Sequence, residues 1–433
     1  MNVVKYVIRL IFIILALLPA TIGVLSVTHG TPVRTVIAPG IGHQPPAVND
    51  SLFARSMELY TGTTLSPGNR VELLLNGNET YPRLWHDISA AQHSITVQLY
   101  YALPGAMSDS ICRYLAERAK VGIRIDVLLD AFGAAALRRT HFVQILQSAG
   151  ARVAWLRPLQ WYTLNRAATR SHVRLVVIDG RVAYTGGFGL ADYWLGDGAH
   201  PNQWRESNVR FEGPAVAAMQ ATFAEGWAEA TGVLLTGSMF MPPASFRTAG
   251  TMVAGLMHTV PAAGSTPAER YLALSIAGAR KTLYITNAYF IPGLDFRTLL
   301  KDAVRRGVDV RVLTASKNTD VKTTWLAGRD YYENLLGGGV RIYEYEAAMM
   351  HAKTMVVDGV WSSIGSMNFD NRSMAFNNEA NLLVLDTAFG GRMDSVFMHD
   401  IAHAKEITLP DFARRAWPEK LVEWGAEKLW RIL

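Results

Sequence analysis

The pattern of apolar and polar residues repeats between the two halves of the chain. Three pairs of segments correspond: 88–101 with 276–290, 111–130 with 299–315, and 148–156 with 337–345. The first pair is typical of a helix end, a polar break and an alternating β-branched strand. The second pair is typical of an amphipathic helix, a glycine stop and a hydrophobic strand. An internal repeat of this length indicates two units of the same fold.

The alternation of strands and helices predicts an α/β sandwich in each half. A chain of 433 residues is too long for one small domain, and it fits two core-bearing units in tandem. We expect the first half over residues 66–240 and the second half over residues 241–433, with an amphipathic tail at its end.

The N-terminal residues have the pattern of a membrane segment. Residues 10–27 (LIFIILALLPATIGVLSV) carry no charge and are just long enough to cross a bilayer. A cleaved signal peptide is the alternative, but no clean small-x-small cleavage site follows, which favours a retained anchor over residues 1–28. Lys5 and Arg9 precede the span, so we expect the N-terminus in the cytoplasm and the bulk of the chain on the outer side of the membrane. Residues 29–65 begin rich in Pro, Gly and Thr and are predicted to be a linker.

Composition narrows the classes of partner. The formal net charge of +6 favours an anionic partner such as nucleic acid, anionic lipid or a phosphate ester. Basic clusters interleaved with stacking aromatic residues are scarce, which argues against a nucleic-acid groove. The single cysteine, Cys112, excludes an intrachain disulfide and a cysteine-based metal cage.

The strongest chemical signal is a spacing that occurs twice. The strings HVRLVVIDG and HAKTMVVDG each contain a histidine, a cation two residues later, an apolar run, and Asp-Gly. Residues i and i+2 share one face of a strand, so His172 lies beside Arg174 and His351 lies beside Lys353. One such triplet alone is most often surface decoration. Surface decoration does not explain why the same spacing recurs at matching places in the two halves.

The end of each motif predicts a hairpin. Asp179 and Asp358 are each followed by glycine, a pair that is typical of tight hairpin turns. We expect both carboxylates to close these turns and to pair with cations rather than to carry protons. The returning strand should stop at small residues, Gly187 in the first half and Ser366 in the second, where backbone N–H groups can approach a ligand.

An imidazole, a fixed cation and a donor-rich turn suit a phosphate oxyanion. Cleavage of a phosphodiester needs a nucleophile and an acid for the leaving oxygen. One histidine can attack phosphorus to form a phosphohistidine, and the other can protonate the leaving group and then activate the acceptor. The two cations would stabilise the equatorial oxygens, so we expect neither a metal nor a cofactor.

The doubled H-x-K-x4-D motif followed by G-[GS]-x-N resembles the phospholipase D superfamily, over roughly residues 66–415. Longer strings, such as ITNAYFIP, GGVRIYEYEAAMMHAKTMVVDG and IGSMNFDNRSM, resemble its bacterial cardiolipin synthase branch. The resemblance implies two phospholipase D-like halves in a pseudo-twofold α/β/α/β/α sandwich, with one active site between them. It also implies a phosphatidyl-histidine intermediate without metal, and transfer between two phosphatidylglycerols at a bilayer that yields cardiolipin and glycerol.

The two motifs differ in completeness. The second motif matches the family pattern through Asn368, whereas the first has Arg174 in place of Lys and Gly189 in place of Asn. The matching positions imply a phosphate-binding set of Gly187, Ser366 and Asn368. The departures leave two alternatives open: a phosphodiester hydrolase, on lipid rather than nucleic acid, and a lipid-binding protein without turnover.

Two glutamates match the places where the family has an acidic residue. We expect Glu206 to bind the far ring nitrogen of His172 and Glu379 to bind that of His351, which would fix each tautomer. A surface glutamate at a strand edge is the alternative. The resemblance makes His172 the nucleophile and His351 the acid.

Two apolar features remain open. The tail LVEWGAEKLWRIL interleaves Trp, Leu and Ile with Lys and Arg, and it either lies at a membrane interface or packs on the domain. A group of aromatic residues around the first motif either lines an acyl groove or belongs to the core: Trp161, Tyr162, Tyr193 and Trp194.

Overall fold

The computed structural model describes residues 33–37, 44–159, 169–243, 247–262 and 264–432, together with a few positions before residue 18. The predicted anchor over residues 1–28 therefore lies almost entirely outside the described residues. Among the residues that are described, no helix combines the length and the apolar character that crossing a membrane requires.

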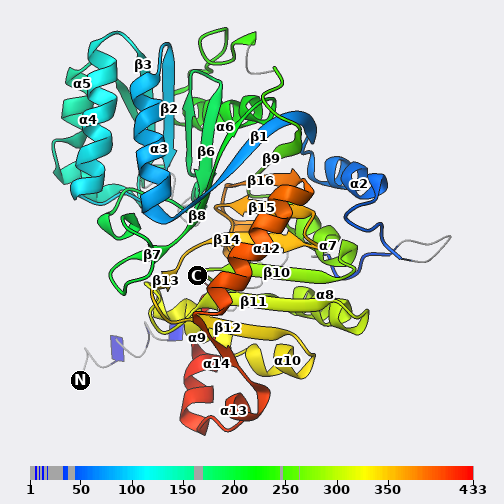
Figure 1. Cartoon of the computed structure of the whole chain (residues 1–433). Coiled ribbons are helices and arrows are strands. Elements are labelled where there is room, and N and C mark those ends of the chain that lie inside the picture. Colours follow the sequence, from blue (N-terminus) through cyan, green and yellow to red (C-terminus); the bar gives the residue numbers. More distant parts are fainter. Residues whose placement is uncertain are drawn as a thin grey trace.

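One sheet of 15 strands runs through the whole molecule (Figure 1). From the middle outward, the first half contributes β1 (Ser66–Leu75), β8 (Ser207–Glu212), β6 (Val182–Gly186), β5 (Leu175–Ile178), β2 (Ser94–Leu99), β3 (Arg124–Asp130) and β4 (Arg152–Leu156). The second half contributes β9 (Met252–Thr259), β16 (Glu379–Leu385), β15 (Trp361–Gly365), β14 (Lys353–Val357), β10 (Thr282–Asn287), β11 (Asp309–Ala315), β12 (Arg341–Tyr345) and β17 (Ala404–Ile407).

The two halves repeat the same strand order, and they meet at β1 and β9. These two strands pair antiparallel, with Ser66 opposite Ala254 and Asn69 opposite Met252. Outward from this junction the seven strands of the first half match seven of the second, and β17 extends the far edge. The prediction of two repeated α/β halves is confirmed, and their sheets join edge to edge. The expected boundary at residue 240 falls between α6 and β9.

Helices cover both faces of the sheet. In the first half α3 (Asn76–Ala90), α4 (Ala106–Lys120) and α5 (Phe142–Ser148) bury one face, and α6 (Ala215–Thr231) covers the other. The second half has α7 (Pro267–Gly278), α8 (Leu294–Arg305), α9 (Lys322–Arg329), α10 (Tyr332–Gly337), α11 (Asn371–Ala375), α12 (Thr387–Ile401), α13 (Leu409–Ala413) and α14 (Trp417–Ile432). The core under α6 continues into the core under α12 across the junction, because β8, β1, β9 and β16 form one apolar surface.

Part of the predicted linker is a structured helix. Residues 29–65 include α2 (Ser51–Thr61), whose Phe53 and Met57 are fully buried in the core of the second half. The Phe53 ring packs edge-on against Trp361, with 5.1 Å between ring centroids. The prediction of a linker is therefore wrong over α2, because apolar residues four apart on this short segment pack on the body of the protein.

Candidate active site

Short bridges between the two halves bring the motif histidines to the middle of the molecule. Strand β7 (Trp204–Arg205) pairs parallel with β13 (Met349–Met350). Directly after this bridge, the backbone N–H of His351 donates to the carbonyl oxygen of Arg205 at 2.8 Å. The start of the second motif is thus fixed to a strand of the first half.

A matching bridge fixes the first motif to the second half. Ser171 pairs with Asn378, and the backbone N–H of His172 donates to the Asn378 carbonyl oxygen at 2.9 Å. Each histidine is therefore anchored beside the residue that precedes a glutamate of the opposite half. The two bridges are related by the internal repeat.

These bridges cross the expected carboxylate pairs. His172 Nδ1 lies 2.9 Å from Glu379 Oε2, and His351 Nδ1 lies 2.6 Å from Glu206 Oε2. The prediction that Glu206 binds His172 and that Glu379 binds His351 is wrong. Each imidazole is held by a carboxylate of the other half, because the bridge, and not the order of residues in the chain, decides which glutamate it meets.

Burial and charge set the protonation of these pairs. Burial alone would raise the pKa of Glu206, but His351 and the neighbouring cations lower it to about 2. The pKa of Glu379 is also lowered, since His172 and Ser366 outweigh its burial. Burial lowers the pKa of both histidines despite their carboxylates. A neutral imidazole that donates Nδ1–H to an ionised carboxylate fits this balance, and it leaves the Nε2 lone pair for chemistry.

The two motif cations are buried between these pairs. Arg174 Nη2 lies 3.0 Å from His172 Nε2, while its buried Nε and Nη1 have no hydrogen-bond partner among the described residues. Lys353 donates its Nζ proton to the carbonyl oxygen of His351. Burial, together with the positive charge of Arg174, lowers the pKa of Lys353 to about 7. Unsatisfied cations in a buried site favour the binding of an anion such as phosphate.

The small residues after each hairpin contact the glutamates. In the second half, Ser366 donates its Oγ–H to Glu379 Oε2 at 2.6 Å. In the first half, Gly187 packs directly on Glu206, and a Cβ atom there would lie 2.4 Å from Glu206 Oε2. Glycine at position 187 therefore has a steric cause, because any side chain would displace the carboxylate that holds His351.

Trp194 explains the missing asparagine of the first motif. A Cβ atom on Gly189 would lie 2.7 Å from the Trp194 ring, so the indole fills the space beside this position. Trp194 Nε1 also donates to Glu206 Oε2 at 3.2 Å. In the second half the matching residue is Asn368, whose buried Oδ1 has no partner in the described part of the chain. Of the two options left open for Trp194, core or acyl groove, burial at 2% exposure supports the core.

Asp179 and Asp358 lie away from the histidines, at the far ends of β5 and β14. Both have a positive φ, 53° and 54°, as the predicted Asp-Gly turns require. The Asp179 carboxylate accepts the backbone N–H groups of residues 92–94, and Asp358 accepts those of residues 280–282. The turn-closing role is confirmed. The expected pairing with cations is wrong, because backbone amides occupy the carboxylates.

Aromatic rings support each imidazole. Tyr100 meets His172 edge-on, with 5.0 Å between centroids, and Trp204 lies tilted against His351 at 4.6 Å. Neither residue was predicted. Trp204 stands two residues before Glu206, and this position was the available signal. Tyr100 directly follows β2 and is far from His172 in the sequence, and only the pairing of β2 with β5 brings it to the site.

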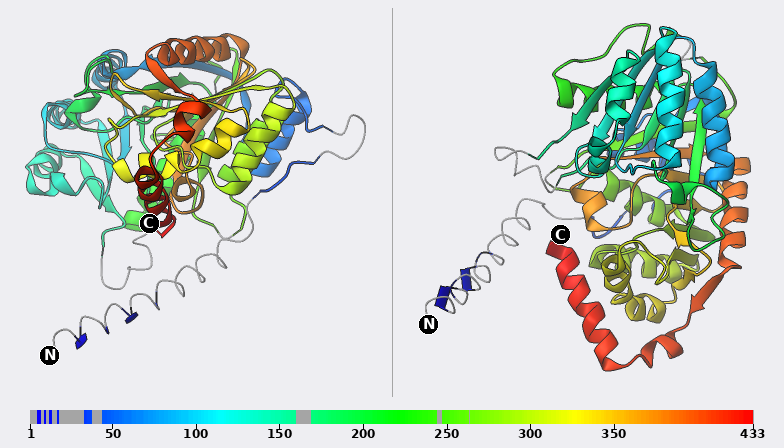
Figure 2. Two further views of the ribbon diagram at one scale, coloured as in Figure 1. Left: turned by 90° about the horizontal axis from the view of Figure 1, so that it is seen from below. Right: turned by 90° about the vertical axis from the view of Figure 1, so that its left-hand side faces the viewer.

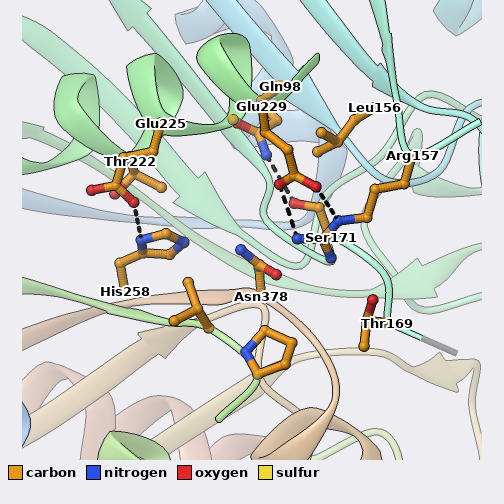
Figure 3. A pocket seen from close by; sticks show the side chains of 13 residues that line it. Gln98, Leu156, Arg157, Thr169, Ser171, Thr222, Glu225, Glu229, His258 and Asn378 are labelled. Carbon is orange, nitrogen blue, oxygen red and sulfur yellow. Dashed lines mark hydrogen bonds and ion pairs between the residues drawn. The ribbon is translucent and has the colours of Figure 1, made fainter. Parts of the chain in front are cut away.

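The two sides of the site differ behind the bridges. Arg205 fills one side, where its guanidinium pairs with Asp400 of α12 at 2.8 Å. The equivalent residue on the other side, Asn378, faces a groove of about 390 Å³ between α6 and the end of β9 (Figure 3). In this groove Glu225 contacts His258 at 3.2 Å. Neither Arg205 nor Asn378 was predicted as a site residue, although each directly precedes a predicted glutamate.

Two imidazoles, each oriented through Nδ1, and two buried cations can bind a phosphodiester. One neutral ring can attack phosphorus through Nε2, and the other, once protonated on Nε2, can protonate the leaving oxygen. The repeated α/β halves and this pair of crossed His–Glu contacts define the phospholipase D class of proteins. A family model described as "Cardiolipin synthase, PLD-like domain" matches residues 84–227 and 272–401. The chain belongs to this family.

Curated relatives agree over most of the chain. A protein named cardiolipin synthase from Geobacillus kaustophilus is 31% identical over 361 residues, which cover 83% of this chain and 71% of that protein. A protein named cardiolipin synthase A from Pseudomonas entomophila is 31% identical over 376 residues, which cover 84% of this chain and 77% of that protein.

Solved structures support the fold. The crystal structure of phosphatidylserine synthase from Haemophilus influenzae covers 88% of this chain and all of that chain, with a TM-score of 0.67 at 14% identity. Polyphosphate kinase from Porphyromonas gingivalis covers 79% of this chain and 49% of that chain, with a TM-score of 0.53 at 12% identity. At these identities the likeness concerns the fold alone.

Proposed function

We propose that this protein is a phosphatidyltransferase that makes cardiolipin from two molecules of phosphatidylglycerol and releases glycerol. The observation that carries the proposal is the pair of buried His–Glu contacts with Arg174 and Lys353 between them. The names of the relatives support a phospholipid substrate and this product.

In the first step, His172 Nε2 attacks the phosphorus of one phosphatidylglycerol. Because Glu379 accepts Nδ1–H, the lone pair lies on Nε2, where it accepts an Arg174 N–H in this structure; Arg174 turns to the phosphate when lipid binds and so frees the lone pair. A P–N bond forms and the P–O bond to the headgroup glycerol breaks. His351, protonated while the phosphate anion is bound, gives its proton to the leaving alkoxide, and glycerol departs.

In the second step, neutral His351 takes the proton from a headgroup hydroxyl of a second phosphatidylglycerol. The oxygen attacks phosphorus, the P–N bond to His172 breaks, and cardiolipin is formed. Glu379 stabilises the positive charge on His172 while the P–N bond exists, and Glu206 does so for protonated His351.

The charge that develops on phosphorus oxygens needs donors that are already in place. Arg174 supplies two unpartnered N–H groups, and Lys353 supplies an ammonium group. We assign Asn368, Ser366 and the backbone of Gly187 to the phosphate-binding set. Asn368 has a buried side chain whose Oδ1 makes no hydrogen bond within the described residues, and its Nδ2–H groups are the donors we assign to phosphate. Ser366 acts mainly by orienting Glu379.

We propose that residues 10–27 anchor the protein in a bacterial cell membrane, with the two halves on the outer side. The uncharged run and the cations before it support this topology.

The test uses the full chain in phosphatidylglycerol vesicles, with wild type compared with His172→Ala and His351→Ala. Formation of cardiolipin and glycerol in equal amounts, lost in both variants, is the expected result. Phosphatidic acid without cardiolipin would replace the transferase with a hydrolase, and vesicle binding without any product would leave a lipid-binding protein.

A further inference from the structure

The C-terminal helix α14 packs on the body of the protein through its charged side. Glu423 and Glu427 are 2% and 1% exposed. Arg329 of α9 donates to Glu423 at 2.8 Å, and Arg415 lies 3.0 Å from the same carboxylate. The hydroxyl of Tyr331 donates to Glu427. These contacts fix which side of α14 faces inward.

The opposite side of α14 presents large apolar residues to solvent: Trp417 (74% exposed), Val422 (55%), Leu421 (54%), Trp424 (51%) and Leu429 (47%). At 3.6 residues per turn these positions share the half of the helix that is turned away from Glu423 and Glu427. A surface helix of a soluble domain normally has the reverse arrangement. An exposed apolar face of this kind indicates a partner surface.

The charges around this apolar face favour an anionic bilayer over a second copy of the chain. Lys420 and Lys428 belong to α14 and Arg414 precedes it; they pair with Glu333, Glu427 and Asp411, respectively. All three cations are exposed to solvent, which weakens these pairs, so the cations can turn to anionic headgroups, and the chain as a whole has a formal charge of +6. Two copies placed face to face would bring these like charges together, whereas anionic headgroups would neutralise them. Tryptophan is also the side chain that prefers the interface between headgroups and acyl chains.

The position of α14 connects it to the active site. The helix packs on α9, and the loop before α9 carries Asp320. The Asp320 carboxylate accepts the Tyr289 hydroxyl at 2.8 Å. Its negative charge also raises the pKa of Lys353, which opposes the effect of burial. Figure 2 shows α14 in red on the outside of the second half, where it packs on α9. Helix α9 follows the C-terminal end of β11, and the parallel neighbour β10 ends at Asn287, opposite Lys353. The motif histidines lie at this edge of the sheet, near the C-terminal ends of β2 and β4.

We propose that the outward face of α14 docks on an anionic phospholipid surface and seats the active-site edge of the sheet against it. The residues at the contact are Trp417, Leu421, Val422, Trp424 and Leu429, with Lys420 and Lys428 near enough to the headgroups to exchange their carboxylate partners, Glu333 and Glu427, for lipid phosphates. Docking itself stands without any catalytic activity. The supply of lipid to the two histidines through this contact rests on the proposed function.

The test places a reporter on α14 in the full chain. Cys112 is the only cysteine and is buried, so a Cys112→Ser background accepts one label at Leu421→Cys. Val121→Cys, 65% exposed on the first half, is the matched control. With an environment-sensitive fluorophore, vesicles that contain phosphatidylglycerol should shift the emission of the label at 421 to the blue and expose it to quenching by lipid-borne nitroxides. The label at 121 should stay water-like.

Emission at 421 that stays water-like on these vesicles would overturn the proposal. A blue shift without vesicles that grows with protein concentration would also overturn it, because a second copy would then cover the helix. An anchor elsewhere in the chain leaves this readout valid, since the label reports only on α14.

A second variant tests the consequence for turnover. Trp417→Ser/Leu421→Ser/Trp424→Ser should lower the rate on phosphatidylglycerol vesicles by roughly tenfold or more, while Val121→Ser/Ile145→Ser should not. Both variants should match wild type on short-chain phosphatidylglycerol dispersed as monomers. Equal loss on both substrates would show damage to the fold and overturn the docking role. Absence of product from wild type on either substrate would defeat the proposed function and leave docking to be decided by the label.

Discussion

The two halves of this protein have the same strand order, yet their contributions to the site are unequal. The second half supplies Lys353, Ser366 and Asn368, the complete family pattern, and the first half supplies Arg174, Gly187 and Gly189. In the first half a tryptophan does part of the work of the absent side chains, because the indole of Trp194 fills the space at Gly189 and donates to a glutamate. A departure from a motif therefore has to be judged with the residues that pack against it.

The largest expected effects come from the histidines, where the halves are most alike. His172→Ala and His351→Ala should each reduce cardiolipin formation by about a thousandfold or more, because each removes one partner of a coupled nucleophile and acid. Acid-quenched protein incubated with labelled phosphatidylglycerol should carry a covalent phosphatidyl group in wild type and none in His172→Ala. Retention of that group in His172→Ala, with loss in His351→Ala, would exchange the two roles.

The crossed carboxylates come next. Glu379→Gln should lower turnover by roughly tenfold to a hundredfold by weakening the orientation of His172, and Glu206→Gln should do the same through His351. Nitrogen NMR of labelled histidines can assign the partner directly. Glu379→Gln should change the tautomer signal of His172 and leave that of His351, and the opposite outcome would restore the uncrossed pairing.

The next difference between the halves is that Asn368 of the second half corresponds to Gly189, covered by Trp194, in the first half. Gly189→Asn alone should lower activity. A Cβ atom at position 189 would lie 2.7 Å from the Trp194 ring, so the new side chain would collide with the indole. Gly189→Asn/Trp194→Ala should recover part of the loss by making the first half resemble the second. The comparison of kcat/KM for the single and double variants measures this coupling.

Trp194→Phe is the control for the hydrogen bond. This variant keeps an aromatic ring and removes Nε1–H. The loss in kcat/KM should correspond to one hydrogen bond to a charged group, about 2 kcal/mol. If kcat/KM of Gly189→Asn/Trp194→Ala is no higher than that of Gly189→Asn, the indole does not compete with asparagine for this space.

The smallest expected effect concerns the pH dependence of kcat/KM, because the second half supplies Lys353 and the first half supplies Arg174. Burial lowers the pKa of Lys353 to about 7, so in the empty site its charge is present below about pH 7 and lost above it. Because the charged form binds phosphate, kcat/KM should fall as pH rises through about 7. Lys353→Arg should flatten this decline, since a guanidinium keeps its proton more firmly.

Arg174→Lys is the matched exchange in the first half. It should add a second group that loses its charge near neutral pH and make the decline of kcat/KM steeper. If the profiles of kcat/KM against pH coincide for wild type and both variants, neither cation causes the decline at high pH.

The repeat in the sequence was sufficient to predict two α/β halves, the turns at Asp179 and Asp358, and the residue types that converge on phosphate. These features depend on periodicity and on residues a few positions apart, which a linear pattern records well. The segment that forms α2 was missed because a short helix after a run of Pro, Gly and Thr has little signal of its own. Its place is decided by Phe53 and Met57 in the core of the other half.

The sequence alone determined the chemistry that is available, namely two histidines, two cations and two carboxylates at matching positions. Only the tertiary structure decided which of them meet. His172 is 207 residues from Glu379 and His351 is 145 residues from Glu206, and no local pattern encodes contacts of that range. Two short bridges between the halves create these contacts, because each bridge fixes a histidine beside the residue that precedes the glutamate of the opposite half.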